Sequence, residues 1–141
     1  MVSAGMRPQE AVREIEARLT AAGCPDADFD ARELFRLVTG ADLRLADQPL
    51  TAAQADRLET LTVRRADREP LQYLCGSWPF LDFELAVGPG VLCPRADTEV
   101  VAEAAAGLLA GVQRPEVLDL CAGTGCLGLG VKRFCPDAVL T

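Results

Sequence analysis

The chain has 141 residues, a length that favours about one domain with a single modest hydrophobic core. Half of the residues are hydrophobic and a quarter are charged, which is typical of a soluble globular protein rather than a disordered or fibrous one. The formal net charge is −7 and Lys132 is the only lysine, so direct binding to nucleic acid is disfavoured.

Six cysteines are spread along the chain without a CxxC pair, and histidine is absent. This pattern disfavours a structural zinc site, and the lack of histidine excludes a Ser-His-Asp or Cys-His catalytic arrangement within the chain. The first residues lack the apolar stretch of a secretory signal, and no apolar run approaches the roughly 20 residues that span a bilayer. We therefore expect no metal, no membrane association, and a cytoplasmic location with free thiols.

The first half of the chain has the pattern of a small helical bundle. Apolar residues at helical spacing predict three helices, over residues 8–22, from Asp26 or Asp28 to Gly40, and from Thr51 to about Arg68. Thr51 and Gln54 form the sequence pattern of a capping box. Arg64, Arg65 and Arg68 are expected to form a solvated face, with a partner-binding role as the alternative. A plain bundle and a protein-docking domain are both compatible with this segment.

The pattern changes after residue 68. Residues 69–76 predict a short helical turn closed by glycine, and the alternation over residues 83–87 predicts a half-buried strand. Gly88-Pro89-Gly90 predicts a turn, after which residues 91–93 are expected to return as the second strand of a hairpin. A hairpin alone is marginally stable in water, so we expect it to rest on a neighbouring element.

A helix is expected from about Asp97 to Leu109, with Asp97 as its N-cap and Glu99 in its first turn. Residues 117–120 then predict a strand, residues 121–128 a glycine turn, and residues up to about 134 a further helix. A new strand begins at residue 138. This order predicts the start of a βαβ unit with a parallel sheet.

The glycine turn is the candidate functional feature. Without Cβ atoms, Gly123 and Gly125 allow the backbone to turn sharply and to approach a ligand at the helix N-terminus. Asp119 is placed at the carboxyl end of the strand, where open α/β sheets bind ligands. Gly123, Gly125 and Gly128 also satisfy the G-x-G-x-x-G pattern, so an NAD(P)-binding domain of an oxidoreductase remains an alternative. A non-catalytic binding module is the second alternative.

Three blocks carry a specific resemblance: REPLQYLCG at residues 68–76, VLCPRADTE at 91–99 and VLDLCAGTG at 117–125. Their order and spacing resemble the HemK/PrmC family of protein-glutamine methyltransferases, which modify peptide chain release factors. The resemblance implies methyl transfer from S-adenosylmethionine to the side-chain amide of a glutamine in the Gly-Gly-Gln motif. It also implies that the helical domain helps to dock a release factor.

The resemblance implies an α + α/β fold: a helical substrate-docking domain at 1–74, a β-hairpin linker at 75–96, and the start of a class I, Rossmann-like domain at 97–141. The residues implied to line or border the cofactor pocket are Asp119, Cys121, Ala122, Gly123, Thr124, Gly125, Pro94, Arg95, Thr98 and Glu99. The family's Asn-Pro-Pro-Tyr motif is absent, so no catalytic residue is assigned. We expect a monomeric fragment of a longer protein, and no methyl transfer by this polypeptide alone.

Overall fold

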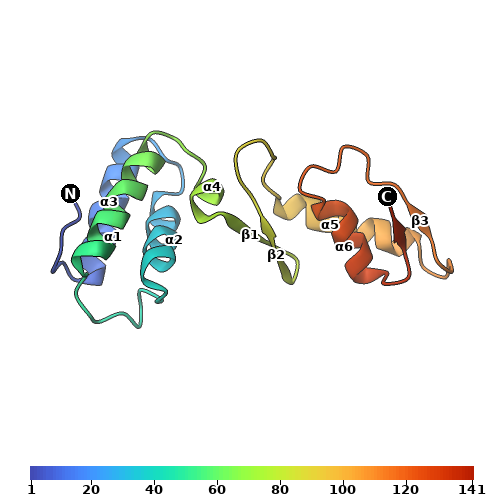
Figure 1. Cartoon of the computed structure of the whole chain (residues 1–141), viewed down its shortest axis with the longest axis horizontal. Helices are drawn as coiled ribbons and strands as arrows, with labels where there is room; N and C mark the ends of the chain where they lie inside the picture. Colours follow the sequence, from blue (N-terminus) through green and yellow to red (C-terminus); the bar gives the residue numbers. More distant parts are fainter. The chain divides into compact units, whose positions relative to one another are not determined.

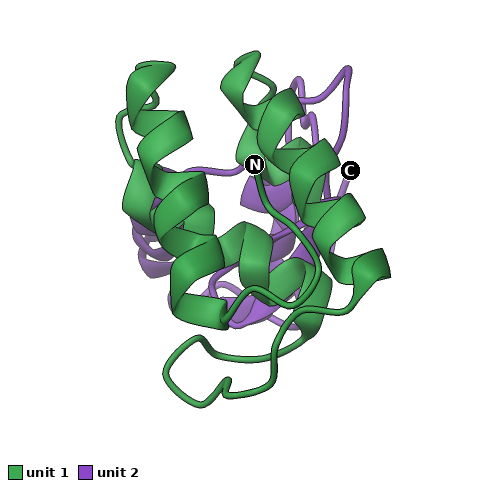
Figure 2. Ribbon diagram, turned by 90° about the vertical axis from the view of Figure 1, so that its left-hand side faces the viewer, with its two compact units in different colours: residues 1–75 green, residues 76–141 purple.

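The computed structural model describes residues 1–141 and divides them into two compact units, Met1–Cys75 and Gly76–Thr141 (Figures 1 and 2). The first unit is entirely helical, whereas the second holds both two-stranded sheets. No helix in the structure combines the length and the apolar character that crossing a bilayer requires.

Unit 1 contains four helices: α1 (Pro8–Ala21), α2 (Ala27–Thr39), α3 (Ala52–Ala66) and the short α4 (Leu71–Cys75). Its core consists of apolar side chains that recur at helical spacing. The largest of those that are fully buried are Ile15, Leu19, Leu34, Phe35 and Leu58. Burying each such side chain contributes roughly 1.5–3 kcal/mol. The prediction of a helical bundle is confirmed, and its three long helices begin and end within about two residues of their predicted bounds.

The predicted capping box at the start of α3 is also confirmed. The hydroxyl of Thr51 accepts a hydrogen bond from the Gln54 backbone N–H at 3.2 Å, and the Gln54 side-chain oxygen accepts one from the Thr51 backbone N–H at 2.9 Å. Two of the N–H groups that a helix start leaves without partners are thereby satisfied. At the C-terminal end of α2, Gly40 takes a φ of +72° and terminates the helix.

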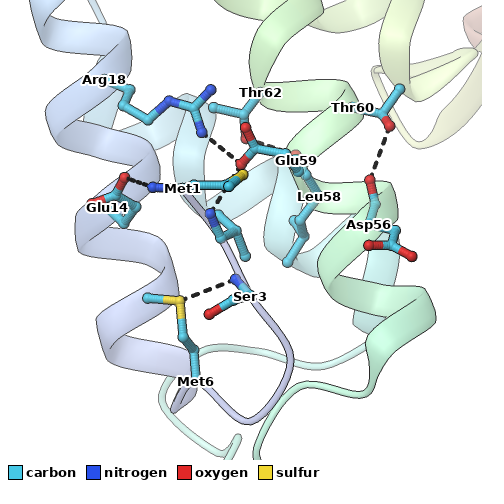
Figure 3. Close-up of polar contacts among 11 residues, drawn as sticks. Met1, Ser3, Met6, Glu14, Arg18, Asp56, Leu58, Glu59, Thr60 and Thr62 are labelled. Atoms are coloured by element: carbon cyan, nitrogen blue, oxygen red, sulfur yellow. Dashed lines mark hydrogen bonds and ion pairs between the residues drawn. The ribbon is translucent and has the colours of Figure 1, made fainter.

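The N-terminal segment is tied to α1 and α3 by two glutamates (Figure 3). Glu59 on α3 accepts hydrogen bonds from Arg18 Nη1 on α1 at 2.6 Å and from the Val2 backbone N–H at 2.9 Å. The Met1 amino group pairs with Glu14. The Arg18 guanidinium lowers the pKa of Glu59 below its usual value, against the opposing effect of partial burial. Glu59 therefore connects two helices and the segment that precedes them.

A buried ion pair joins α2 to α3. Arg65 Nε lies 2.7 Å from Asp30 Oδ2, and the two side chains are only 13% and 5% exposed. Arg65 Nη1 also donates to the Glu69 carbonyl oxygen at 3.2 Å. The prediction that Arg64, Arg65 and Arg68 form a solvated face is therefore wrong for Arg65. Its partner lies 35 residues away in the sequence, where local charge patterns carry no information about it.

Unit 2 contains β1 (Ser77–Phe80), β2 (Phe83–Ala86), α5 (Ala96–Leu108), β3 (Glu116–Val117), α6 (Cys126–Phe134) and β4 (Val139–Leu140). The strands β1 and β2 pair antiparallel, and β3 and β4 pair parallel. Its buried apolar residues are fewer than those of unit 1 and are spread over several elements: Phe80, Leu85, Val87, Ala102, Val131 and Ala138.

The hairpin differs from the prediction. Residues 77–80 pair with 83–86 through a tight turn at Leu81, which takes a φ of +53°. The predicted return strand over residues 91–93 is wrong, because these residues are not part of any strand. The true partner strand contains Pro79, and proline is usually excluded from the interior of a sheet. In a two-stranded hairpin both strands are edges, and edge strands tolerate proline.

Helices α5 and α6 pack closely because small residues lie between them. A Cβ atom added to Gly130 on α6 would lie 2.9 Å from Ala102 Cβ on α5 and 3.0 Å from Phe80 Cε1 on β1. Real Cβ atoms essentially never approach other atoms at less than 3.0 Å. Glycine at position 130 therefore permits α5, α6 and the hairpin to share one small core.

The parallel pairing that the sequence predicts around α6 is confirmed. Glu116 is opposite Val139 and Val117 is opposite Leu140. Backbone hydrogen bonds continue this ladder to Asp119, whose N–H donates to the Thr141 carbonyl oxygen at 2.8 Å. Several large apolar side chains of the unit stay exposed, among them Val100, Val101, Leu118, Leu120 and Val139.

Candidate functional site

The loop between β3 and α6 has an unusual backbone conformation. Three of its residues lie in the left-handed region: Cys121 at a φ of 60°, Gly123 at 58° and Gly125 at 76°. Glycine adopts this conformation readily, whereas for Cys121 it costs roughly 1–2 kcal/mol. The Gly125 N–H donates to the Ala122 carbonyl oxygen at 2.8 Å, and Gly125 is also the N-cap of α6. The chain thus reverses sharply between the strand and the helix.

Asp119 is fixed between that strand and that helix. Its backbone N–H belongs to the parallel ladder, and its Oδ2 accepts a hydrogen bond from the Gly128 N–H at 2.9 Å. A Cβ atom on Gly128 would lie 2.7 Å from Asp119 Oδ2 and 2.8 Å from Leu140 Cδ1. Gly128 is therefore the residue that permits the carboxylate to reach α6. The sequence showed Gly128 only as a member of a glycine pattern, not as the partner of Asp119.

The six predicted residues at 119 and 121–125 lie together in this loop. Cys121, Ala122 and Gly123 are exposed, and Thr124 and Gly125 are half-buried. A Cβ atom on Gly123 would meet no atom of the chain closer than 4.0 Å, so the outer side of the loop is open. An open, sharply turned main chain beside a helix N-terminus fits a ligand that contacts backbone atoms. Their role in holding a cofactor stays a prediction.

The second predicted segment, residues 94–99, leads into α5. The helix begins at Ala96 with Arg95 as its N-cap, and Arg95 has an extended backbone and no side-chain cap hydrogen bond. The predicted N-cap at Asp97 is therefore wrong, because the helix starts before it. Asp97 nevertheless lies in the first turn, where a negative charge is favourable beside the helix dipole.

Glu99 already has a partner within the fold. Its Oε1 accepts a hydrogen bond from the Leu81 N–H at 2.7 Å, which stabilises the turn between β1 and β2. Pro94 is buried, Thr98 is half-buried and Arg95 is exposed. No hydrogen bond joins residues 94–99 to residues 119–125. The structure thus gives Glu99 a structural role that the sequence did not indicate, and the segment's part in a cofactor pocket stays a prediction.

No group of three or more histidine, cysteine, aspartate or glutamate side chains is placed to hold a metal ion. All six cysteines are free thiols; Cys121 is exposed and Cys24 is buried. Partial burial raises the pKa of the Cys75 thiol, and the negative charge of Glu33 acts in the same direction.

Comparison with known proteins adds an independent observation to this geometry. Residues 10–76 match the family model described as the PrmC N-terminal domain. The chain is also 38% identical over 136 residues to a release factor glutamine methyltransferase of Bifidobacterium longum, a match that covers 90% of this chain and 46% of the relative. The chain belongs to the HemK/PrmC family.

Two further HemK/PrmC relatives, both named release factor glutamine methyltransferase, match at similar levels. The one from Corynebacterium glutamicum is 38% identical over 137 residues, which is 93% of this chain and 47% of the relative. The one from Deinococcus radiodurans is 36% identical over 141 residues, which is 96% of this chain and 50% of the relative. The matches therefore include the glycine loop as well as the helices. The chain spans about half the length of the curated relatives it matches.

Proposed function

We propose that this chain contributes substrate docking and one wall of the S-adenosylmethionine pocket to a HemK/PrmC methyltransferase. The whole protein would methylate the glutamine side-chain amide in the Gly-Gly-Gln motif of a peptide chain release factor. The names of the relatives support this reaction and this substrate class. The observation that carries the proposal is the loop of residues 119–125, which leaves a parallel strand, turns through three left-handed residues and enters α6.

In the proposed organisation, residues 1–74 form the docking domain and residues 75–96 the linker. Residues 97–141 form the start of a class I, Rossmann-like methyltransferase domain. The family-model match over residues 10–76 supports the separation of the helical part from the rest. The parallel pairing of β3 and β4 on either side of α6 supports the α/β assignment. We also propose a cytoplasmic location, because release factors act in translation. We further propose that the protein is a monomer.

S-adenosylmethionine, when bound, supplies a methyl group on a positively charged sulfonium. Asp119 would contribute negative charge at the end of β3; its Oδ2 is held by Gly128, and its second oxygen makes no hydrogen bond within the chain. Gly123 and Gly125 would let the main chain touch the cofactor. The remaining residues proposed to line or border the pocket are Cys121, Ala122, Thr124, Pro94, Arg95, Thr98 and Glu99.

Calorimetric titration of the chain with S-adenosylmethionine and with NAD tests the cofactor assignment. We expect S-adenosylmethionine to bind and NAD not to bind. Gly123→Ala should weaken this binding, because a side chain at a φ of +58° strains the loop and occupies its open side. Gly111→Ala is the matched control, since Gly111 also has a positive φ and open surroundings but lies outside the loop. Binding of NAD alone would support the dinucleotide alternative.

Docking is tested separately with an immobilised bacterial release factor. We expect the full chain to be retained in the absence of any cofactor. Failure of the chain to bind the release factor would contradict the docking role without affecting the cofactor assignment. Retention of the release factor by a chain that binds neither cofactor would support the alternative of a non-catalytic binding module.

A further inference from the structure

The N-terminus of α6 has the features that commonly attract an anion. Backbone N–H groups in the first turn of a helix lack partners within the helix, and the helix dipole places partial positive charge there. The preceding turn is rich in glycine, and Gly125, the N-cap, has no side chain to satisfy these groups. In dinucleotide-binding proteins this arrangement receives a pyrophosphate.

Here the chain supplies its own anion at that place. The carboxylate of Asp119 reaches from the end of β3 to α6, and its Oδ2 accepts the hydrogen bond of the Gly128 N–H at 2.9 Å. Gly128 is the third residue of the helix, so this contact satisfies one of the first-turn donors. The backbone of Asp119 is meanwhile held by the ladder bond to Thr141 at 2.8 Å. The fold therefore holds Asp119 through both its backbone and its carboxylate, which fixes the position of the negative charge.

Glycine at position 128 is a condition for this contact. Any larger residue would place its Cβ atom 2.7 Å from Asp119 Oδ2 and 2.8 Å from Leu140 Cδ1, closer than such atoms approach. The third glycine of the G-x-G-x-x-G pattern thus serves two purposes. It allows α6 to pack on β4, and it brings the carboxylate of Asp119 to the helix.

We infer that Asp119 is a specificity-determining residue that excludes phosphate-bearing ligands from the α6 N-terminus, with Gly128 as its positioning residue. The inference rests on the proposed role of this loop in cofactor binding and goes beyond it, because it states which cofactor class the loop rejects. A pyrophosphate at this position would meet a fixed carboxylate that lies beside the first-turn N–H groups and already occupies that of Gly128. Since like charges a few ångströms apart repel strongly in a partly buried site, the loop selects a ligand without phosphate.

Asp119→Asn provides a direct test, because the amide oxygen can keep the hydrogen bond from Gly128 while the charge is lost. The probes are inorganic pyrophosphate and ADP, titrated calorimetrically into the full chain at low salt. We expect the variant to bind both at least about tenfold more tightly than the wild type, and added salt to reduce the gain. Asp137→Asn is the matched control, because it removes an exposed aspartate from the same unit outside the loop.

Two results would overturn the inference: no gain for Asp119→Asn, or an equal gain for Asp137→Asn, which would reflect net charge alone. Hydrogen exchange of the Gly128 amide tests the positioning contact. Exchange should be slow in the wild type and in Asp119→Asn, and fast in Asp119→Ala; equally fast exchange in all three would contradict the role of Gly128. If S-adenosylmethionine binds to none of the proteins, the proposed cofactor is wrong, but the comparison with pyrophosphate still decides this inference.

Discussion

Replacing Asp30 with alanine is expected to destabilise the helical unit strongly. The Asp30 side chain is 5% exposed, and the change leaves the Arg65 side chain, 13% exposed, without its 2.7 Å partner. Breaking a buried ion pair by removing one member costs about 3–5 kcal/mol. Arg65 keeps its hydrogen bond to the Glu69 carbonyl oxygen, which favours the lower end, so we expect a loss of about 3 kcal/mol. For a domain of this size that corresponds to a fall in melting temperature of more than about 10 °C.

Urea unfolding of the full chain, followed by circular dichroism, measures this loss. Asp30→Ala, Arg65→Ala and the double variant form a cycle in which the double variant should lose at least about 1 kcal/mol less than the sum of the two single losses. Asp42→Ala is the control, because Asp42 and Arg44 form an ion pair in which the side chains are 42% and 87% exposed. An Asp30→Ala protein as stable as Asp42→Ala would refute the assignment of Asp30 and Arg65 as a stabilising buried pair.

Three further predictions follow from other contacts. Gly130→Ala should destabilise unit 2 by about 1–2 kcal/mol in urea unfolding, because overpacking outweighs the gain in helix propensity. Gly107→Ala is the control and should not destabilise the unit, because no atom lies within 4 Å of the added Cβ. Since Arg18 lowers the pKa of Glu59, the stability that Glu59 contributes is present above pH ~4.3 and is lost as the pH falls through the lowered pKa. Arg18→Ala should therefore have a lower unfolding midpoint than the wild type at pH 7, and this difference should shrink as the pH falls below ~4.3. Cys121, the exposed thiol, should be the first of the six to react with a maleimide in mass spectrometry; slower labelling there than at the half-buried thiols would contradict the open loop.

The helical unit was largely predictable because its signals are local. Helical spacing of apolar residues and the pairing of Thr51 with Gln54 depend on neighbours within one or two turns, and both were confirmed. The buried partner of Arg65 was not predictable, because Asp30 is distant in sequence and an isolated aspartate carries no sign of burial. Long-range ion pairs depend on how helices pack, which a single sequence does not state.

The second unit shows where local patterns fail. The alternation over residues 83–87 correctly indicated a strand, but the turn at residues 88–90 indicated a partner at residues 91–93. The true partner precedes the strand, at residues 77–80. The glycines were similarly ambiguous. Glycine is needed at positions 123 and 125 because φ is positive there, and at positions 128 and 130 because neighbouring atoms leave no room for a Cβ. The sequence alone presents all four as one glycine-rich stretch.

The loop of residues 119–125 is proposed to border the S-adenosylmethionine pocket. Two-dimensional NMR of the isotope-labelled chain during titration with S-adenosylmethionine tests it most directly, because each backbone amide reports separately. We expect saturable shifts for the amides of Gly123 and Gly125, and none for amides in α1 to α3. Unmoved loop amides in a folded chain, or equal shifts on titration with NAD, would contradict it.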